Sequence, residues 1–411
     1  MRIAIVSDLE SIGGAAIVAE RLAQRWRGGH DVQRYVGDRF CSSGSISYDV
    51  TKGRGWLRRL RLEHTAQAGS IYACLRGRRL LDLLETFRPD VINIHDIHFH
   101  PLPSSIVGNM QRLAPVVWTL HNMWSFTGGC ANNLGCDLYL TGCREPCPRK
   151  HRRPAADVPD VGARWRSGRA LLASYAGMRV YAVTPSRWLH ECATRGGWSQ
   201  DRLHTIPNGV DVRGFSPMDP AAAKRALMIP ADRVCLMFSA GDAVREPDKG
   251  YALLQRALEQ FPIGARPFCL IVGHDAEMSD DDRLVLGYTK GLTFLRICYA
   301  AADGFVLPSL AENAPLVLLE ALAMGLPCVS FDVGGCPEIV RDGETGFVAK
   351  GGDVGSLAAA LRLLVSLGEE GRKAMGLACR RVAERDYSLD LQSERYLRLF
   401  AEVIANGAVT S

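Results

Sequence analysis

Two glutamates eight positions apart, Glu312 and Glu320, are the side chains of this sequence best spaced to bind the hydroxyl groups of a ligand. Pro315 lies between them, and proline is favoured in the first turn of a helix, where its missing N–H would have no partner. Because the apolar residues that follow recur at helical spacing, we expect Glu312 in a loop and Glu320 within a helix. The N–H groups at the start of this helix, at Leu316 and Val317, would then attract a phosphate.

Two strand-like segments, Gly304–Leu307 and Pro327–Phe331, flank this helix and complete a βαβ unit. In an open parallel sheet, ligands bind at the carboxyl ends of the strands. A phosphate at the helix start, with carboxylates on either side of it, suits a nucleotide sugar. The alternative interpretation is that Glu320 is a solvated helix position and Glu312 a cap, and the spacing of the pair alone does not exclude it.

Residues 301–348 carry these features in the sequence AADGFVLPSLAENAPLVLLEALAMGLPCVSFDVGGCPEIVRDGETGFV. This segment closely resembles the donor-binding signature of the retaining family-four glycosyltransferases, which have the GT-B fold. The resemblance implies that Glu312 binds the donor sugar and Glu320 the ribose. The donor-binding residues that it implies here are Glu312, Asn313, Ala314, Leu316, Val317 and Glu320. The family commonly has Phe-Gly after its first glutamate, whereas this chain has Pro315 nearby, which removes one phosphate-binding N–H.

A further candidate for the phosphate is Lys249, in the segment GDAVREPDKG before a predicted helix. A lysine there can pair with a diphosphate as a point charge, and it resembles the phosphate lysine of the family. The alternative is a solvated lysine. The family often has an arginine five positions earlier, where this chain has Val244. Arg245 is adjacent and is the residue we consider for that contact.

The first half opens with a strand at Arg2–Ser7, a loop, and a helix from about Ala15 to Trp26. This order suits a Rossmann-like domain, and Gly13-Gly14 would let the backbone approach a phosphate closely. The pattern is not G-x-G-x-x-G, so it supports dinucleotide binding only weakly. The glycine pair resembles the N-terminal glycine loop of the family, which lies near the donor diphosphate and the acceptor. A simple turn is the alternative.

Two further apolar runs, at 90–95 and 116–120, read as parallel strands. Polar residues follow their carboxyl ends, where an open α/β sheet keeps its site. These residues are His95, Asp96 and His98 after the first strand and His121 and Asn122 after the second. His121 also resembles the first-domain histidine of the family, which approaches the donor sugar, and it is the stronger candidate. For each of these histidines a purely structural role is the alternative.

The segment after His121 contains four cysteines with the spacing C-x5-C-x6-C-x3-C, in the sequence WSFTGGCANNLGCDLYLTGCREPCP. They are Cys130, Cys136, Cys143 and Cys147. Four thiolates can bind a structural zinc and so order a loop that has little apolar content to bury. Disulfides and unlinked cysteines are the alternatives. The segment resembles one found in a subgroup of the family that is associated with exopolysaccharide synthesis of the colanic-acid type.

With 411 residues, the chain exceeds one ordinary core and we expect two domains. The resemblance implies an α/β, GT-B fold of two Rossmann-like domains facing across a cleft. We expect an acceptor-side domain at 1–185, a linker region at 186–212 and a nucleotide-sugar-binding domain at 213–387. The C-terminal segment 388–411 would pack back on the first domain. No apolar run reaches the length of a membrane span, and 13 cysteines, an odd number, fit a reducing cytoplasm.

The net charge of +5 is unevenly distributed. Residues 1–200 carry 27 Lys and Arg against 16 Asp and Glu, whereas the remainder carries 22 against 28. Within a predicted helix at 54–87, the basic stretch 52–62 has the pattern of an amphipathic helix that lies on an anionic membrane surface. The solvated face of a packed helix is the alternative. We expect no nucleic-acid partner.

Taken together, these features predict a cytoplasmic glycosyltransferase, either free or peripheral on the inner face of the cytoplasmic membrane. It would move a hexose-type sugar from a UDP- or GDP-sugar to a saccharide or lipid-diphosphate saccharide with retention, and His121, Glu312 and Lys249 would act in catalysis. No cofactor is expected for catalysis, since we interpret the acidic run Ser279–Asp282 as a helix N-terminal signal rather than a metal site. The alternatives are a nucleotide-sugar epimerase, a phosphorylase or a non-catalytic sugar-nucleotide-binding protein.

Overall fold

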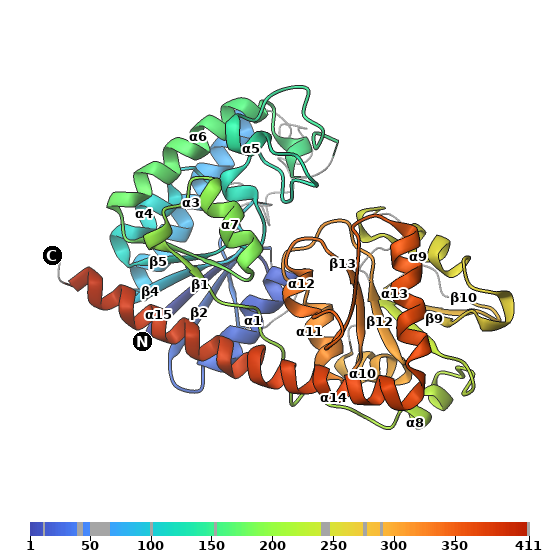
Figure 1. Cartoon of the computed structure of the whole chain (residues 1–411). Helices are drawn as coiled ribbons and strands as arrows, with labels where there is room; N and C mark the ends of the chain where they lie inside the picture. Colours follow the sequence, from blue (N-terminus) through green and yellow to red (C-terminus); the bar gives the residue numbers. More distant parts are fainter. Residues whose placement is uncertain are drawn as a thin grey trace, which may run out of the picture. The chain divides into compact units, whose positions relative to one another are not determined.

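The described part of the chain forms two compact α/β units, each with its own seven-stranded sheet (Figure 1). The first unit comprises Met1–Pro207 and Gln392–Ser411, and the second comprises Asn208–Leu391. The computed structural model describes residues 1–10, 13–38, 44–49, 66–98, 102–151, 154–239, 247–273, 278–287 and 291–408.

The sheet of the first unit is parallel and has the order β3-β2-β1-β4-β5-β6-β7. Its central strands are short, fully buried apolar runs, which is typical of a parallel sheet covered on both faces. Strands β2 and β3 are added on one side of β1, and β4 to β7 are added on the other. The sheet is therefore doubly wound, with a switch point between β1 and β4. The strands are β1 (Arg2–Leu9), β2 (Asp31–Asp38), β3 (Ile46–Ser47), β4 (Val91–Ile94), β5 (Val116–Thr119), β6 (Val180–Thr184) and β7 (Leu203–Thr205).

Helices flank this sheet. One core joins strand residues such as Ala4 and Ile92 to α3 and α4. Two helices begin at side chains that cap them: Asp160 accepts from the N–H of Ala163, and Ser186 from that of Leu189. The helices of four or more residues are α1 (Gly14–Trp26), α3 (Ala66–Phe87), α4 (Ile106–Leu113), α5 (Leu138–Thr141), α6 (Val161–Ser174) and α7 (Arg187–Arg195).

The C-terminal helix α15 (Leu389–Ala408) packs on the first unit. The indole Nε1 of Trp26 donates to Ser393 Oγ over 2.9 Å, and the same indole makes an edge contact with Phe400. Tyr396 of α15 is fully buried and its hydroxyl lies 2.9 Å from Thr119 Oγ1 at the end of β5. The helix thus reaches a strand end of the first sheet through a buried hydrogen bond.

The second unit repeats the doubly wound pattern. Its sheet has the order β10-β11-β9-β8-β12-β13-β14, with a switch point between β8 and β12, and only the β10–β11 pair is antiparallel among the described strands. The strands are β8 (Cys235–Ser239), β9 (Phe268–Val272), β10 (Met278–Ser279), β11 (Arg283–Leu286), β12 (Gly304–Leu307), β13 (Cys328–Phe331) and β14 (Gly346–Ala349).

Two cores cover the faces of this second sheet. One contains residues of α9 and α13, and the other contains residues of the remaining helices of the unit. In Figure 1 α9 and α13 accordingly lie together on one side of β12 and β13, while α10 and α11 lie on the other. The helices are α8 (Pro220–Ala226), α9 (Tyr251–Leu258), α10 (Leu292–Ala301), α11 (Leu316–Ala323), α12 (Cys336–Ile339), α13 (Val354–Ser366) and α14 (Gly368–Asp386).

The structure differs from two expectations and leaves part of a third outside the described residues. The acidic run at Ser279–Asp282 does not start a helix: Asp280 closes the β10–β11 turn by accepting from the N–H groups of Asp282 and Arg283. Of the linker region expected at 186–212, residues 186–207 belong to the first unit and include α7 and β7. Of the helix predicted at 54–87, the part from Ala66 is observed as α3, and the basic stretch 52–62 lies outside the described residues. Within the parts of the chain that the structure describes, no helix is long and apolar enough to cross a membrane.

Candidate functional site

The predicted phosphate lysine and donor glutamate meet in the second unit. Lys249 follows β8 and Glu312 follows β12, so they lie on either side of the switch point. The Lys249 Nζ is 2.9 Å from Glu312 Oε1. Their side chains are 31% and 14% exposed, which leaves the pair accessible from solvent without being fully solvated. A cation and a carboxylate are therefore held together where a doubly wound sheet binds its ligand.

The loop that carries Lys249 is locked to the loop after β12. Leu310 donates its N–H to the carbonyl of Asp248 over 2.7 Å. Gly250 has a φ of 75°, and a Cβ at this position would overlap the carbonyl of Pro308. Only glycine fits both this backbone conformation and this close approach. The position of Lys249 is thereby set by backbone contacts and not by its own flexible side chain.

Two other segments hold the backbone around Glu312. Gly334 has a φ of 56°, and a Cβ there would overlap the carbonyl oxygen of Glu312. The N–H of Gly335 donates to the carbonyl of Asn313 over 3.0 Å. Asn208, buried at the start of the second unit, donates its side-chain amide to the carbonyl of Ala314 over 3.0 Å. Asn208 and the two glycines contribute to this site through contacts that are distant in sequence.

Helix α11 begins immediately after this loop, with Pro315 at its N-cap position. The N–H groups of Leu316 and Val317 belong to its first turn, where helical N–H groups have no intrahelical acceptor. Glu320 lies within the helix, as predicted, and is 6% exposed. Its Oε2 accepts a hydrogen bond from Tyr299 Oη over 3.3 Å. The alternative of a solvated Glu320 is therefore wrong.

In the first unit, the glycine pair lies at the start of α1, after β1. Gly13 has a φ of 88° and its carbonyl accepts from the N–H of Ile17, which begins the helix. A Cβ at Gly13 or Gly14 would meet nothing within 4 Å. Glycine is thus required at 13 for its conformation, and the space beside both residues is open. Ser11 and Ile12, which precede the pair, lie outside the described residues.

A strand-end cluster of five residues follows β4 and β5. The rings of His95 and His121 stack at 5.1 Å between centroids, and His95 Nδ1 is 2.8 Å from His121 Nε2. Asn122 Nδ2 donates to Asp96 Oδ1 over 3.2 Å, and His98 Nδ1 is 3.6 Å from the same oxygen. With Trp124 and neighbouring residues, this cluster lines a small pocket with a cavity volume of about 10 Å³. The cluster consists of His95, Asp96, His98, His121 and Asn122.

The hydrogen bonds around His95 determine which nitrogen of His121 carries a proton. Asn93 donates its amide to the carbonyl of Val117, so its Oδ1 is the atom that faces His95 Nε2, and Nε2–H must donate to it over 2.9 Å. A neutral His95 then has an unprotonated Nδ1, which accepts from His121 Nε2–H. His121 is left with Nδ1 as a hydrogen-bond acceptor. Asn93 was not identified from the sequence, because its role depends on contacts across strands.

Burial controls the protonation of this cluster. It lowers the pKa of His121 to about 3, with the charge of His98 adding to the effect, and it lowers the pKa of His98 to about 4. Burial and the neighbouring His121 and Arg34 also hold the pKa of His95 well below its ordinary value. The pKa of Asp96 is raised to about 7 by burial, against the hydrogen bond from Asn122. The three imidazoles are therefore neutral at pH 7, and the proton that titrates near neutrality is that of Asp96.

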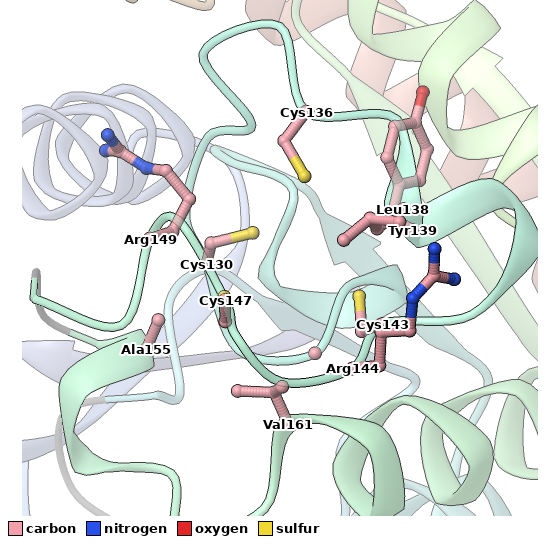
Figure 2. Close-up of a pocket in the computed structure, with 11 residues that line it drawn as sticks. Cys130, Cys136, Leu138, Tyr139, Cys143, Arg144, Cys147, Arg149, Ala155 and Val161 are labelled. Atoms are coloured by element: carbon pink, nitrogen blue, oxygen red, sulfur yellow. The ribbon is translucent and has the colours of Figure 1, made fainter.

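The four cysteines lie in the first unit, in residues 127–151, here called the cysteine loop. All four are free thiols, and together they line one pocket (Figure 2). Burial raises the pKa of Cys130, and raises that of Cys143 to about 11. Among the described residues, no group of three or more His, Cys, Asp or Glu side chains is set closely enough to hold a metal ion as it stands.

Arg245, the candidate for a second phosphate contact, lies outside the described residues.

Comparison with known proteins assigns a family to both units. The family described as Glycosyltransferase Family 4 matches residues 12–213, and the family described as Glycosyl transferases group 1 matches residues 236–366. Sucrose-phosphate synthase from Thermosynechococcus elongatus has a similar structure, with a TM-score of 0.73, 17% identity and coverage of 99% of this chain and 100% of that one. Anabaena Alr3699/HepE, solved in complex with UDP-glucose, has a TM-score of 0.66 at 15% identity, with coverage of 99% and 100%.

Each unit thus matches a glycosyltransferase family, and the chain has the GT-B fold. Among curated relatives of this GT-B chain, the D-inositol 3-phosphate glycosyltransferase of Nocardia farcinica is 31% identical over 238 residues, which are 54% of this chain and 51% of that protein. The enzyme of the same name from Mycobacterium bovis is 34% identical over 198 residues, or 44% and 40%. The chain thus spans about half the length, or less, of these relatives.

The candidate residues divide between the two domains of the GT-B chain. Lys249, Glu312 and Glu320 lie in the segment matched by the group 1 family, and Gly13 and His121 lie in the segment matched by Family 4. Within the second unit, the structure brings Lys249 to Glu312. Within the first, it brings His121 to His95. Each of these pairs joins loops from neighbouring strands, which sequence order alone does not show.

Proposed function

We propose that this protein transfers a hexose-type sugar from a nucleotide-sugar donor to a saccharide or lipid-linked saccharide acceptor, with retention of configuration. The observation that carries the proposal is the Lys249–Glu312 pair, fixed by backbone contacts beside the first turn of α11. A cation and the positive end of a helix suit a diphosphate. A neighbouring carboxylate suits sugar hydroxyls.

The residues of the second unit would divide the donor between them. Lys249 and the N–H groups of Leu316 and Val317 would stabilise the charge that develops on the departing diphosphate, which is an electrostatic form of catalysis. Glu312 would accept hydrogen bonds from the donor sugar. Glu320 would accept from the ribose hydroxyls, with Tyr299 holding its carboxylate in position. UDP or GDP is the expected nucleotide, and the complexes of Alr3699/HepE with UDP and UDP-glucose support the former by analogy.

In the first unit, His121 would present its unprotonated Nδ1 to a sugar hydroxyl. Its low pKa keeps this atom an acceptor over the whole physiological range. Gly13 and Gly14 would allow close approach of a ligand, because the space beside them is open. Retention would follow a front-face route, in which the departing phosphate oxygen takes the proton of the acceptor hydroxyl. This route forms the new glycosidic bond on the face from which the phosphate leaves and requires no carboxylate nucleophile, unlike retaining glycosidases.

The acceptor and the cellular role belong to the same proposal. We propose a role in exopolysaccharide or cell-surface glycan synthesis, based on the resemblance of the cysteine loop and on the basic first half of the chain. An acceptor carried on a lipid diphosphate would be anionic and would lie at a membrane surface. Vesicle binding that requires anionic lipid and weakens with salt would support this part, whereas equal binding to neutral vesicles would reject it.

A thermal-shift panel of UDP-, GDP- and ADP-sugars tests donor binding. A ligand at 100 times its Kd stabilises the folded state by about 2.7 kcal/mol. Loss of a charge-assisted phosphate contact worth about 1.5–3 kcal/mol in Lys249→Met should weaken the affinity about 10- to 150-fold. Lys373→Met is the matched control, since Lys373 is an exposed lysine paired with Glu369 and Glu370 on α14.

We expect one nucleotide class to shift the melting temperature of the wild type and of Lys373→Met, and to shift Lys249→Met much less. The absence of any shift in the wild type, or equal shifts in all three proteins, would contradict the donor site. An epimerase or a pure binding protein would also show the shift, and is distinguished by whether nucleoside diphosphate is released.

A further inference from the structure

All four cysteines of the cysteine loop line one small pocket, with a cavity volume of about 20 Å³. They reach it from separate turns of the loop, and Figure 2 shows their sulfur atoms pointing into the same space. Gly128 contributes to the wall: a Cβ there would come within 2.8 Å of Cys143 Cβ and 2.7 Å of the carbonyl oxygen of Val161. Four thiols that are separated by up to seventeen positions in the sequence therefore meet in one pocket with tightly packed walls.

These four cysteines differ from the others that the structure describes. Apart from the exposed Cys74 on α3, the others are buried: Cys235, Cys298 and Cys328, for example, lie on strands and helices at 0% exposure, where a thiol behaves as a small apolar side chain. The four loop cysteines are half-buried and lie in or beside turns. Core packing accounts for the first kind and does not account for the second.

The cysteine loop contains little regular secondary structure. Apart from the one-turn helix α5 (Leu138–Thr141), it consists of turns and irregular backbone. A few contacts tie it to the rest of the unit, such as the bond from Trp165 Nε1 to the carbonyl of Tyr139 over 2.7 Å. Long loops with little secondary structure of their own are uncommon in compact domains, and a bound metal can supply the folding free energy that such a loop lacks.

The charges at the pocket favour a metal held by thiolates. A divalent ion bound by four thiolates has a net charge of −2. Arg144 and Arg149 line the same pocket and would offset this charge. Four sulfur ligands in a tetrahedral arrangement are typical of zinc, or of iron in an iron–sulfur site, and exclude the hard cations that prefer oxygen.

We propose that Cys130, Cys136, Cys143 and Cys147 bind one zinc ion in a closed, structural site. Binding replaces four S–H bonds by four Zn–S bonds and releases four protons to solvent, so that no oxidant or reductant is needed. Zn–S bonds of about 2.3 Å require the sulfur atoms to lie about 3.8 Å apart. Because the thiols are not yet set closely enough to hold an ion, loading draws them inward from the walls of the pocket.

The site would fix the loop that follows the strand-end cluster. The N–H of Met123, next to Asn122, donates to the carbonyl of Ala131 over 2.8 Å. Thr127 Oγ1 donates to the carbonyl of Cys130 over 2.8 Å. A metal at Cys130 would therefore hold the chain immediately after Asn122. The inference does not depend on the proposed transferase activity, since its test involves no sugar nucleotide.

The test is metal analysis of protein that has been purified under reducing conditions without chelator or added metal. We expect about one zinc per chain. The double variant Cys143→Ser/Cys147→Ser should lose the zinc. Cys74→Ser, which changes an exposed thiol of α3, is the matched control and should keep it. Chelator should release the zinc from the wild type and lower its melting temperature.

A second measurement applies if the double variant does not fold. The stripped and reduced wild-type protein is titrated with Co²⁺, which should bind one per chain and give a thiolate-to-metal charge-transfer band that Zn²⁺ removes. The proposal is overturned if neither purified nor titrated protein holds zinc, if the folded double variant retains it, or if iron takes its place. Disulfides among the four cysteines, found by peptide mapping of protein kept free of reductant, would overturn it as well.

Discussion

The tautomer of His121 can be predicted from a chain of hydrogen bonds, and His95→Phe is the change that breaks this chain. His95 is fully buried and is bonded through both ring nitrogens, to Asn93 Oδ1 at 2.9 Å and to His121 Nε2 at 2.8 Å. Phenylalanine fills a similar space and leaves both partners unsatisfied. A buried polar group without its partner costs about 1–3 kcal/mol. With two partners left unsatisfied, Asn93 and His121, we expect a total loss of about 2–4 kcal/mol from the free energy of unfolding.

The assay is nitrogen NMR of the histidine side chains, with chemical denaturation for stability. In the wild type, His121 should carry its proton on Nε2 and stay neutral down to about pH 4, because burial holds its pKa near 3. In His95→Phe the preference for that tautomer should weaken. The pKa should remain low, since burial and not His95 is its main cause. A wild-type His121 that is protonated on Nδ1, or that becomes charged near pH 6, would contradict this assignment of the tautomer.

Three further predictions concern stability. Lys249→Met and Glu312→Gln should each destabilise the protein by about 1–2 kcal/mol, and the double variant should cost less than their sum, as measured by a double-mutant cycle; additivity would mean that the pair is not coupled. When the pH falls from 7.5 to 5, the free energy of unfolding of Asp96→Asn should fall by about 2–3 kcal/mol relative to that of the wild type. The folded-state pKa of Asp96 is raised to about 7, so the folded wild type gains a proton, and hence stability, in this window; parallel pH profiles would contradict this. Gly334→Ala should destabilise the protein by more than about 3 kcal/mol, or prevent folding, because it adds an overlap with the Glu312 carbonyl to the strain of a positive φ. Gly343→Ala, which also has a positive φ but places its Cβ in open space, should cost about 1–2 kcal/mol. Equal costs in denaturant unfolding would show that the overlap is relieved.

Local pattern was sufficient to predict the centre of the second unit. The strand at Gly304–Leu307 and the placement of Glu312 before the helix and Glu320 within it are observed as predicted. The reason is that each depends on neighbours in sequence: four apolar residues, then polar residues, then a proline at the helix start. The GT-B fold was predicted from the resemblance of residues 301–348 to a glycosyltransferase family, and the doubly wound order of both sheets agrees with it.

What the sequence did not show depends on contacts distant in sequence. The acids at Asp280–Asp282 can cap a helix or close a turn, and the pairing of β11 with β9 decides for the turn. Strand β7 has only three residues and is recognised only through its pairing with β6. The roles of Asn93, Asn208 and Gly334 are of the same kind, since each acts on backbone or side chains brought in from another element.

The most direct test of the account is the release of nucleoside diphosphate from a panel of UDP-, GDP- and ADP-sugars, with water or added saccharides as acceptors. We expect release from one nucleotide class by the wild type and by Lys373→Met. In Lys249→Met, which folds but lacks the cation beside the departing diphosphate, the rate should fall at least about tenfold. No release by the wild type from any donor, or equal rates in all three proteins, would contradict the claim that the loops at Lys249 and Glu312 catalyse glycosyl transfer.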